Sequence, residues 1–302
     1  MGQFSPDILS EFDVHQQVDL RTYTRIGIGG PADYLVVVRD PEQLVRLYNI
    51  CLRTGIRFLP LGHGSNVLFP DEGYRGLVAV LAFDHIEALG ETGFLVQAGA
   101  SLAELNRLCI CRSLTGFEFS SGIPGTVGGA VYGNAGAYGK NIGECVTGGR
   151  VLLPDGTVRD VDHDFFGFDY RHSALKSNGA ILLSVRIALE KGDYEAILKR
   201  VREIRSIRCK KLPHWSTLTA GSFFKNIPNP GGHNIAAAKY LDEIGSKQAR
   251  IGDAGVHPKH ANVIYNMGHA TARDVLALED LLRERVRERF QIELQREVMY
   301  LD

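Results

Sequence analysis

The sequence of 302 residues is poor in tryptophan, methionine and cysteine, and it has no excess of either charge. It contains one Trp, three Met and five Cys, and its 34 Lys and Arg nearly balance 35 Asp and Glu, for a net charge of −1. Balanced charge disfavours nucleic acid or an anionic membrane as the main partner. No apolar run approaches the roughly 18 residues that a membrane-spanning helix needs. These absences favour a globular protein with small-molecule substrates, and no obligate protein partner is evident.

The cysteines are odd in number and match no metal-binding pattern. Cys109 and Cys111 form a close pair, but no second pair completes a zinc site. We therefore expect no metal and five reduced thiols, as is typical of a cytoplasmic protein. The N-terminus has no basic segment followed by an apolar core, so no signal peptide is expected.

Apolar periodicity predicts a protein of mixed helices and strands. Residues 1–22 are polar and are expected to form a loosely tied lead-in. Strands are expected at 32–38, 57–61, 76–83, 93–98 and 180–189, around Ser222 and Val263, and in a hairpin at 149–161. Helices are expected at 41–54, 101–112, 193–208, 235–244 and 271–290, with Asp40 and a Ser101/Glu104 capping box beginning the first two. The composition changes near residue 210, where we expect a domain boundary.

Glycine-rich segments are the most unusual feature of the composition, with 34 glycines in the chain. Residues 27–32 fit the G-x-G-x-x-A dinucleotide fingerprint, but Pro31 and a β-rich segment follow where a helix is required. Residues 62–66 form either a tight turn between strands or a nest of backbone N–H groups that binds an anion. Residues 121–139 are expected to be extended and non-helical, with backbone lying against a cofactor.

Three reactive side chains lie far apart in the sequence. Ser222 stands between a glycine and two aromatic residues, Arg171 lies in Tyr-Arg-His-Ser, and Glu297 lies near the C-terminus. A hydroxyl, a guanidinium and a carboxylate suit a site where charge develops and a proton moves. Taken singly, each also fits an ordinary role: a strand-edge hydroxyl, a surface ion pair and the solvated face of a strand.

Several motifs occur together in one order. They are Gly62–Phe69, Gly122–Gly139, Tyr170–Ser173, Gly221–Asn226, Lys259–Asn262 and Leu294–Val298. From about residue 20 onward the chain thereby resembles the UDP-N-acetylenolpyruvoylglucosamine reductase family, in its shorter subtype. The resemblance implies an α+β FAD-binding fold of the vanillyl-alcohol-oxidase type with a C-terminal α+β substrate-binding domain. The expected parts are two FAD-binding subdomains, at 1–72 (joined by a C-terminal strand at 298–302) and at 73–208, and a substrate-binding domain at 209–297.

The family likeness also implies which residues contact each ligand. Non-covalent FAD would be held by Gly62, His63, Gly64, Ser65, Asn66, Gly122, Ile123, Gly125, Thr126, Gly128, Gly129, Asn134, Gly136, Ala137 and Tyr138. Substrate would be bound by Tyr170, Lys211, Lys225, Asn226 and His260. A departure lies at Ile227-Pro228, where the family usually has proline directly after the asparagine.

The reaction implied by the resemblance is the NADPH-dependent reduction of UDP-N-acetylglucosamine enolpyruvate to UDP-N-acetylmuramate for peptidoglycan synthesis. Ser222 would donate the proton, Arg171 would stabilise the growing charge, and Glu297 would polarise the enol ether. A sugar or alcohol oxidase on the same scaffold is the main alternative, but an oxidase has no need to protonate a carbanion. A non-catalytic sensor of flavin or UDP-sugar is a further alternative.

Overall fold

The computed structural model describes residues 11–229 and 231–302. Contacts divide the chain into two compact units that are each discontinuous in sequence. The first comprises the residues up to Gln16, Tyr34–His63 and Gly76–Arg208, and the second comprises Gln17–Asp33, Gly64–Arg75 and Cys209–Asp302. Along the chain, β1 (Val14–Asp19), β2 (Pro31–Val38), β5 (Tyr74–Leu81) and α5 (Tyr194–Lys211) each pass from one unit to the other.

The first unit begins with a strand–helix–strand arrangement. Helix α1 (Pro41–Thr54) starts where Asp40 accepts a 2.6 Å hydrogen bond from the Gln43 amide, and it ends at Gly55, whose φ is 71°. These are the predicted cap and stop. Strand β3 (Phe58–Leu61) pairs in parallel with β5, in a sheet of order β1-β2-β5-β3. Leu44 and Leu47 bury the apolar face of α1 in the core.

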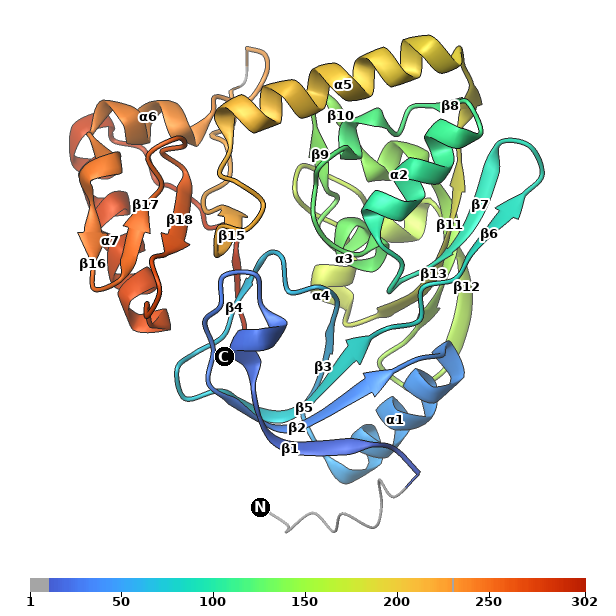
Figure 1. Ribbon diagram of the computed structural model, residues 1–302. Helices are drawn as coiled ribbons and strands as arrows, with labels where there is room; N and C mark the ends of the chain where they lie inside the picture. The colour runs from blue at the N-terminus through green and yellow to red at the C-terminus, as the bar shows by residue number, and fades with distance from the viewer. Residues whose placement is uncertain (1–10, 230) are drawn as a thin grey trace. The chain divides into compact units, whose positions relative to one another are not determined.

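A five-stranded antiparallel sheet forms the rest of the first unit's framework (Figure 1). Its order is β12-β11-β13-β7-β6, from the strands β6 (Ile86–Leu89), β7 (Gly93–Gln97), β11 (Val146–Leu152), β12 (Val158–Asp162) and β13 (Ile181–Ala188). The predicted hairpin is confirmed, because β11 and β12 pair directly. Helices α2 (Leu102–Cys111) and α3 (Val127–Tyr132) precede β11, and α3 contacts β7 and β13. Short elements complete the unit: β8 (Leu114–Thr115), β9 (Gly136–Ala137), β10 (Lys140–Asn141), α4 (Leu175–Asn178) and β14 (Glu190–Lys191).

The second unit contains an antiparallel sheet of order β15-β18-β17-β16. Its strands are β15 (Thr219–Ser222), β16 (Arg250–Ile251), β17 (Ala254–Val256) and β18 (Val263–Asn266). Helix α7 (Ala272–Phe290) contacts β16, β17 and α6 (Ala237–Glu243). The C-terminal strand β19 (Met299–Tyr300) pairs in parallel with β4 (Val67–Leu68).

Helix α7 has a doubly satisfied N-terminus. Thr271 and Asp274 form a reciprocal capping box. The carboxylate of Asp71, from a distant loop, also accepts hydrogen bonds from the Ala272 and Arg273 amides at 2.7 and 3.1 Å. Amides that lack partners within a helix are thus satisfied by side chains, and the Asp71 loop is fixed to the helix.

Two local expectations are wrong. Residues 14–19 form a strand rather than part of a loose lead-in; residues 1–10 of that expectation lie outside the described residues. At α2 the helix is as predicted but the capping box is not, because Ser101 makes no side-chain cap hydrogen bond. Glu104 instead pairs with Arg107 through hydrogen bonds of 2.6 and 2.9 Å, since a charged partner one turn on competes with the backbone.

The glycine-rich segment is also not wholly non-helical, because α3 occupies its centre. Thr126 begins α3 by accepting a hydrogen bond from the Gly129 amide. A Cβ on Gly128 would lie 2.8 Å from both the Cβ and the carbonyl oxygen of Ala98. Glycine there lets the helix approach the end of β7 closely, and this packing outweighs the poor helix propensity of glycine.

No helix among the described residues is both long and apolar enough to cross a membrane.

Candidate active site

Ser222 and Glu297 are brought onto adjoining segments of the second unit. Ser222 ends β15 with its side chain exposed, and the next residue, Phe223, accepts a 2.8 Å backbone hydrogen bond from the Glu297 amide. A second backbone bond of 2.8 Å joins the Lys225 amide to the carbonyl of Gln295. A hydroxyl and a carboxylate distant in sequence are therefore carried on segments whose backbones pair.

Two asparagines fix these segments from either side. The amide of Asn262, which is 3% exposed, makes two hydrogen bonds with the backbone of Phe224, at 2.8 and 2.9 Å. Asn66 donates a 3.1 Å hydrogen bond to the carbonyl oxygen of Glu297. Asn262 is not among the residues that the sequence predicts for the site. Its position two residues after His260 in Lys-His-Ala-Asn was a signal, since a buried amide must bond to something.

Among the predicted substrate-binding residues of the second unit, His260 lies near cationic side chains. Burial and then the charge of Lys247 lower the pKa of His260, and Lys211 contributes in the same direction. Nδ1 of His260 also accepts a 3.3 Å hydrogen bond from the backbone N–H of Asn262, which a neutral imidazole allows. The side-chain oxygen of Asn226 accepts a 3.3 Å hydrogen bond from the backbone N–H of Ala237 at the start of α6. This oxygen therefore helps to hold the N-terminus of α6. Substrate binding by these residues stays a prediction.

Arg171 lies in the first unit, in a strained turn. Its φ is 54°, which is uncommon for a residue other than glycine, and Asp169 and His172 pair across the turn. The half-buried guanidinium donates a 2.9 Å hydrogen bond to the carbonyl of Gly136, and its Cζ lies 5.4 Å from the Tyr170 ring centre. The turn therefore aims Arg171 at the glycine-rich segment, beside the exposed ring of Tyr170.

Most of the predicted FAD residues also lie in the first unit, where backbone contacts are tight. A Cβ on Gly62 would lie 2.5 Å from Oγ1 of Thr126, so only glycine fits there. The side-chain amide of Asn134 bonds to the backbone. It donates a 2.8 Å hydrogen bond to the carbonyl of Asp169 and accepts one of 3.0 Å from the N–H of Gly143. The others in this unit are His63, Gly122, Ile123, Gly125, Gly128, Gly129, Gly136, Ala137 and Tyr138.

Gly64, Ser65 and Asn66 belong to the second unit, and the surroundings of Gly64 and Ser65 test whether this turn fits a cofactor. Gly64 has φ 57°, and a Cβ there would lie 2.0 Å from the carbonyl oxygen of Tyr23. The buried hydroxyl of Ser65 has no hydrogen-bond partner among the described residues, although such a group costs about 1–3 kcal/mol when unsatisfied. A tight glycine turn followed by an unsatisfied hydroxyl fits a phosphate-bearing cofactor, so the residues here suit FAD.

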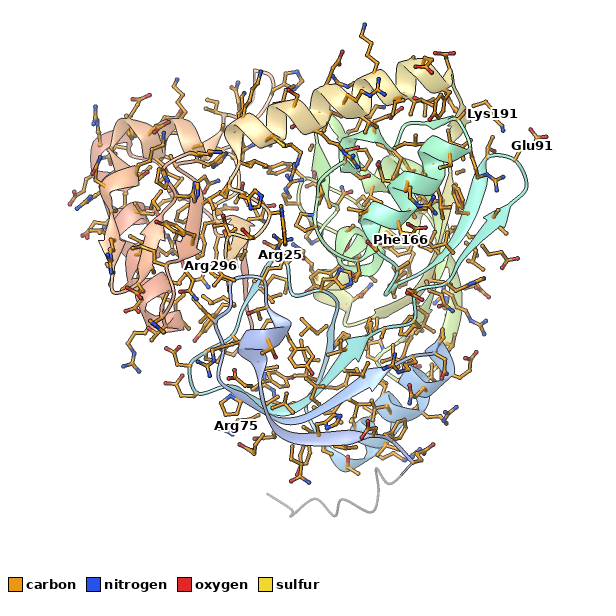
Figure 2. All side chains as sticks on the ribbon, in the orientation of Figure 1. Arg25, Arg75, Glu91, Phe166, Lys191 and Arg296 are labelled. Atoms are coloured by element: carbon orange, nitrogen blue, oxygen red, sulfur yellow. The ribbon has the colours of Figure 1, made fainter. Side chains whose placement is uncertain are left out.

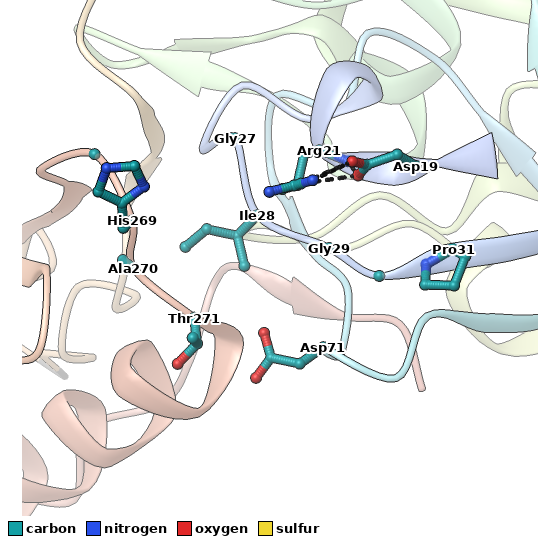
Figure 3. Close-up of a pocket in the computed structure, with 12 residues that line it drawn as sticks. Asp19, Arg21, Gly27, Ile28, Gly29, Pro31, Asp71, His269, Ala270 and Thr271 are labelled. Carbon is teal, nitrogen blue, oxygen red and sulfur yellow. Dashed lines mark hydrogen bonds and ion pairs between the residues drawn. The ribbon is translucent and has the colours of Figure 1, made fainter.

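A separate cavity of about 460 Å³ lies in the second unit (Figure 3). None of its lining residues is a predicted site residue. Its two carboxylates already have partners, since Asp19 pairs with Arg21 and Asp71 caps α7. The lining comprises Asp19, Arg21, Gly27, Ile28, Gly29, Gly30, Pro31, Asp71, Gly268, His269, Ala270 and Thr271. We therefore assign no chemistry to this cavity.

Comparison with known proteins agrees with this geometry. Residues 213–301 match the C-terminal domain of UDP-N-acetylenolpyruvoylglucosamine reductase, and residues 32–162 match an FAD binding domain. A reductase of that name from Streptococcus pneumoniae strain 70585 is 37% identical over 297 residues, covering 98% of this chain and 96% of that protein. The chain belongs to the UDP-N-acetylenolpyruvoylglucosamine reductase family. A crystal structure of the reductase from Thermus caldophilus has a TM-score of 0.80 and 34% identity, covering 96% of this chain and 100% of that one.

Membership of the reductase family confirms the predicted resemblance and the predicted α+β fold class. The FAD binding domain confirms FAD as the expected cofactor at the level of the domain. Among the described residues, no group of three or more His, Cys, Asp or Glu side chains is arranged to hold a metal ion. The individual contacts of FAD, nicotinamide and substrate remain predictions.

Proposed function

We propose that this chain reduces UDP-N-acetylglucosamine enolpyruvate to UDP-N-acetylmuramate, with NADPH as the reductant and FAD bound without a covalent bond. The observation that carries the proposal is the placement of Ser222 and Glu297 on hydrogen-bonded segments in a member of the reductase family. When bound, FAD supplies the hydride that reaches the methylene carbon of the enolpyruvyl group. From the family likeness we also propose two FAD-binding subdomains, at 1–72 with 298–302 and at 73–208, and a substrate-binding domain at 209–297.

The side chains of the protein handle charge and protons. As hydride arrives, negative charge develops toward the substrate carboxylate, and Arg171 provides a permanent cation and planar donors that suit a carboxylate. Glu297, in its protonated form, polarises the enol ether. Ser222 then gives a proton to the neighbouring carbon, which completes the lactyl ether.

A serine is a poor acid, so its role needs support from its surroundings. The carbon that it protonates is strongly basic, which makes the transfer downhill. Lys225 lies three residues on, and its cation would stabilise the alkoxide that the transfer leaves behind. Exposure of the Ser222 side chain leaves it accessible to a small molecule.

Substrate binding rests on the cations of the second unit. Lys211 and Lys225 would bind the diphosphate, with His260 and Asn226 as polar contacts, and Tyr170 would contact the substrate from the first unit. We also propose that small molecules are the only obligatory partners of the reaction.

Ser222→Ala tests the proton-donor role. The variant should retain FAD and be reduced by NADPH at the wild-type rate, because no proton from Ser222 is needed in that half of the cycle. Reoxidation by the enolpyruvyl substrate should slow by about 100-fold or more, the usual contribution of a positioned acid. Equal reoxidation rates in the variant and the wild type would contradict the assignment of Ser222. Ser216→Ala, which changes an exposed serine of the same unit, serves as the matched control.

A further inference from the structure

A buried carboxylate interrupts the apolar stripe of α7. Val275, Leu278, Leu282 and Val286 face the core of the second unit, and Glu279 lies among them with 0% of its surface exposed. Acidic side chains are almost never fully buried without a partner. A cation is therefore expected beside this carboxylate.

Arg296 is that cation. Its Nε donates a 2.9 Å hydrogen bond to Oε1 of Glu279 and lies 2.8 Å from Oε2. Arg283, one turn along α7, is more distant at 3.7 Å and its side chain is 41% exposed. Arg296, labelled in Figure 2, directly precedes Glu297. The pair, with a fully buried carboxylate and an arginine side chain that is 30% exposed, thus joins α7 to the segment that carries the proposed catalytic carboxylate.

The direction of side chains along this segment alternates. Leu294 and Val298 are 1% and 3% exposed and belong to the core, and Arg296 lies between them, directed at Glu279. In extended backbone, neighbouring side chains point to opposite faces. With Arg296 directed inward, Glu297 is placed on the opposite face, while its backbone pairs with Phe223 beside Ser222.

We infer that the Glu279–Arg296 pair is a positioning device that sets the register of residues 294–298 and so holds Glu297 opposite Phe223, the residue after Ser222. A slip of one residue would turn Glu297 toward the core and leave Glu279 without its cation. Buried ion pairs add little net stability compared with apolar residues, and setting register is their best-supported use. The inference deepens the proposed function, on which its catalytic part rests.

The decisive variant is Glu279→Leu/Arg296→Leu, which replaces the pair by apolar side chains. Its thermal midpoint should match or exceed that of the wild type, because an apolar pair suits this core. Hydrogen exchange of the Glu297 amide should nevertheless be at least 10-fold faster, since the register is no longer fixed. Flavin reduction by NADPH should be unchanged, and reoxidation by the enolpyruvyl substrate should be at least 10-fold slower.

Three single variants complete the test. Arg296→Lys keeps a cation and should retain wild-type exchange and turnover. Glu279→Gln keeps the shape but removes the charge, so exchange at Glu297 should be faster, and this variant is informative even if the double variant does not fold. Arg283→Leu removes the more distant cation and should change neither the hydrogen exchange of the Glu297 amide nor turnover.

Two results would overturn the inference. The first is wild-type hydrogen exchange of the Glu297 amide in both the double variant and Glu279→Gln. The second is wild-type flavin reoxidation in a double variant that is as stable as the wild type. If the pair acted on stability alone, a double variant as stable as the wild type would also have wild-type activity. The exchange measurement needs no substrate. If the wild type did not use the enolpyruvyl substrate, the proposed function would fail while the register could still be tested.

Discussion

Replacing Gly64 by alanine should show whether the turn at residues 62–66 is built for close approach to FAD. Gly64 has φ 57°, and a Cβ there would lie 2.0 Å from the Tyr23 carbonyl oxygen and 2.9 Å from Cα of Thr24. Both neighbours are backbone atoms, and the Gly64 carbonyl accepts a 3.0 Å bond from the Arg25 amide. The backbone itself would therefore have to move.

The expected cost has two parts. A left-handed alanine costs about 1 kcal/mol relative to glycine. Forcing extra volume into a packed site adds about 1–3 kcal/mol. Gly245→Ala isolates the first part, because Gly245 has φ 69° and a Cβ there would meet nothing within 4 Å. Gly64→Ala should therefore lower the free energy of unfolding by at least about 1 kcal/mol more than Gly245→Ala does.

The assay is guanidinium unfolding of both variants after removal of flavin, because bound FAD would itself add stability. Flavin absorbance per mole of protein, measured after reconstitution with FAD, gives the FAD content of each variant. We expect Gly245→Ala to rebind FAD fully and Gly64→Ala to rebind little. Equal unfolding free energies together with equal flavin content would refute the close approach and its link to the cofactor.

Two further predictions concern stability. Asp71→Ala removes both hydrogen bonds to the N-terminus of α7 and should cost about 1–2 kcal/mol in urea unfolding, whereas Glu72→Ala, whose ion pair is highly exposed, should cost less than about 1 kcal/mol. Equal costs would show that Asp71 does not cap the helix. The pKa of His260 lies below its ordinary value of 6.5, first because of burial and then because of Lys247, so the unfolded chain binds a proton that the folded chain disfavours. The stability that wild type holds over His260→Gln should therefore shrink as pH falls below 6.5, and a constant difference from pH 8 to 5 would contradict this.

Local signals in the sequence were enough to predict most elements. Asp40 and Gly55 bound α1, and Thr271 begins α7, because caps act within a few residues of the helix end. Helix α3 was missed because its glycines disfavour a helix, whereas the Thr126 cap and the close packing of Gly128 against Ala98 favour one. Strand β1 was missed because its residues are polar and mostly not buried.

Non-local pairings lay beyond the sequence alone. The buried position of Glu279 depends on Arg296, and the two lie on elements whose contact no local pattern encodes. Likewise, Ser222 and Glu297 lie 75 residues apart, and only the structure shows that their segments pair, through the backbone bond from Glu297 to Phe223. The arrangement depends on how strands pair, which the hydrophobic pattern limits but does not determine.

The most direct test of the proposed function is an anaerobic spectral titration of the purified, flavin-loaded protein. One equivalent of NADPH should bleach the yellow flavin band, and UDP-N-acetylglucosamine enolpyruvate added next should restore it without oxygen, with UDP-N-acetylmuramate as the product. If the flavin stayed bleached until air was admitted, the proposed substrate would be wrong and an oxidase on the same scaffold would become the better account.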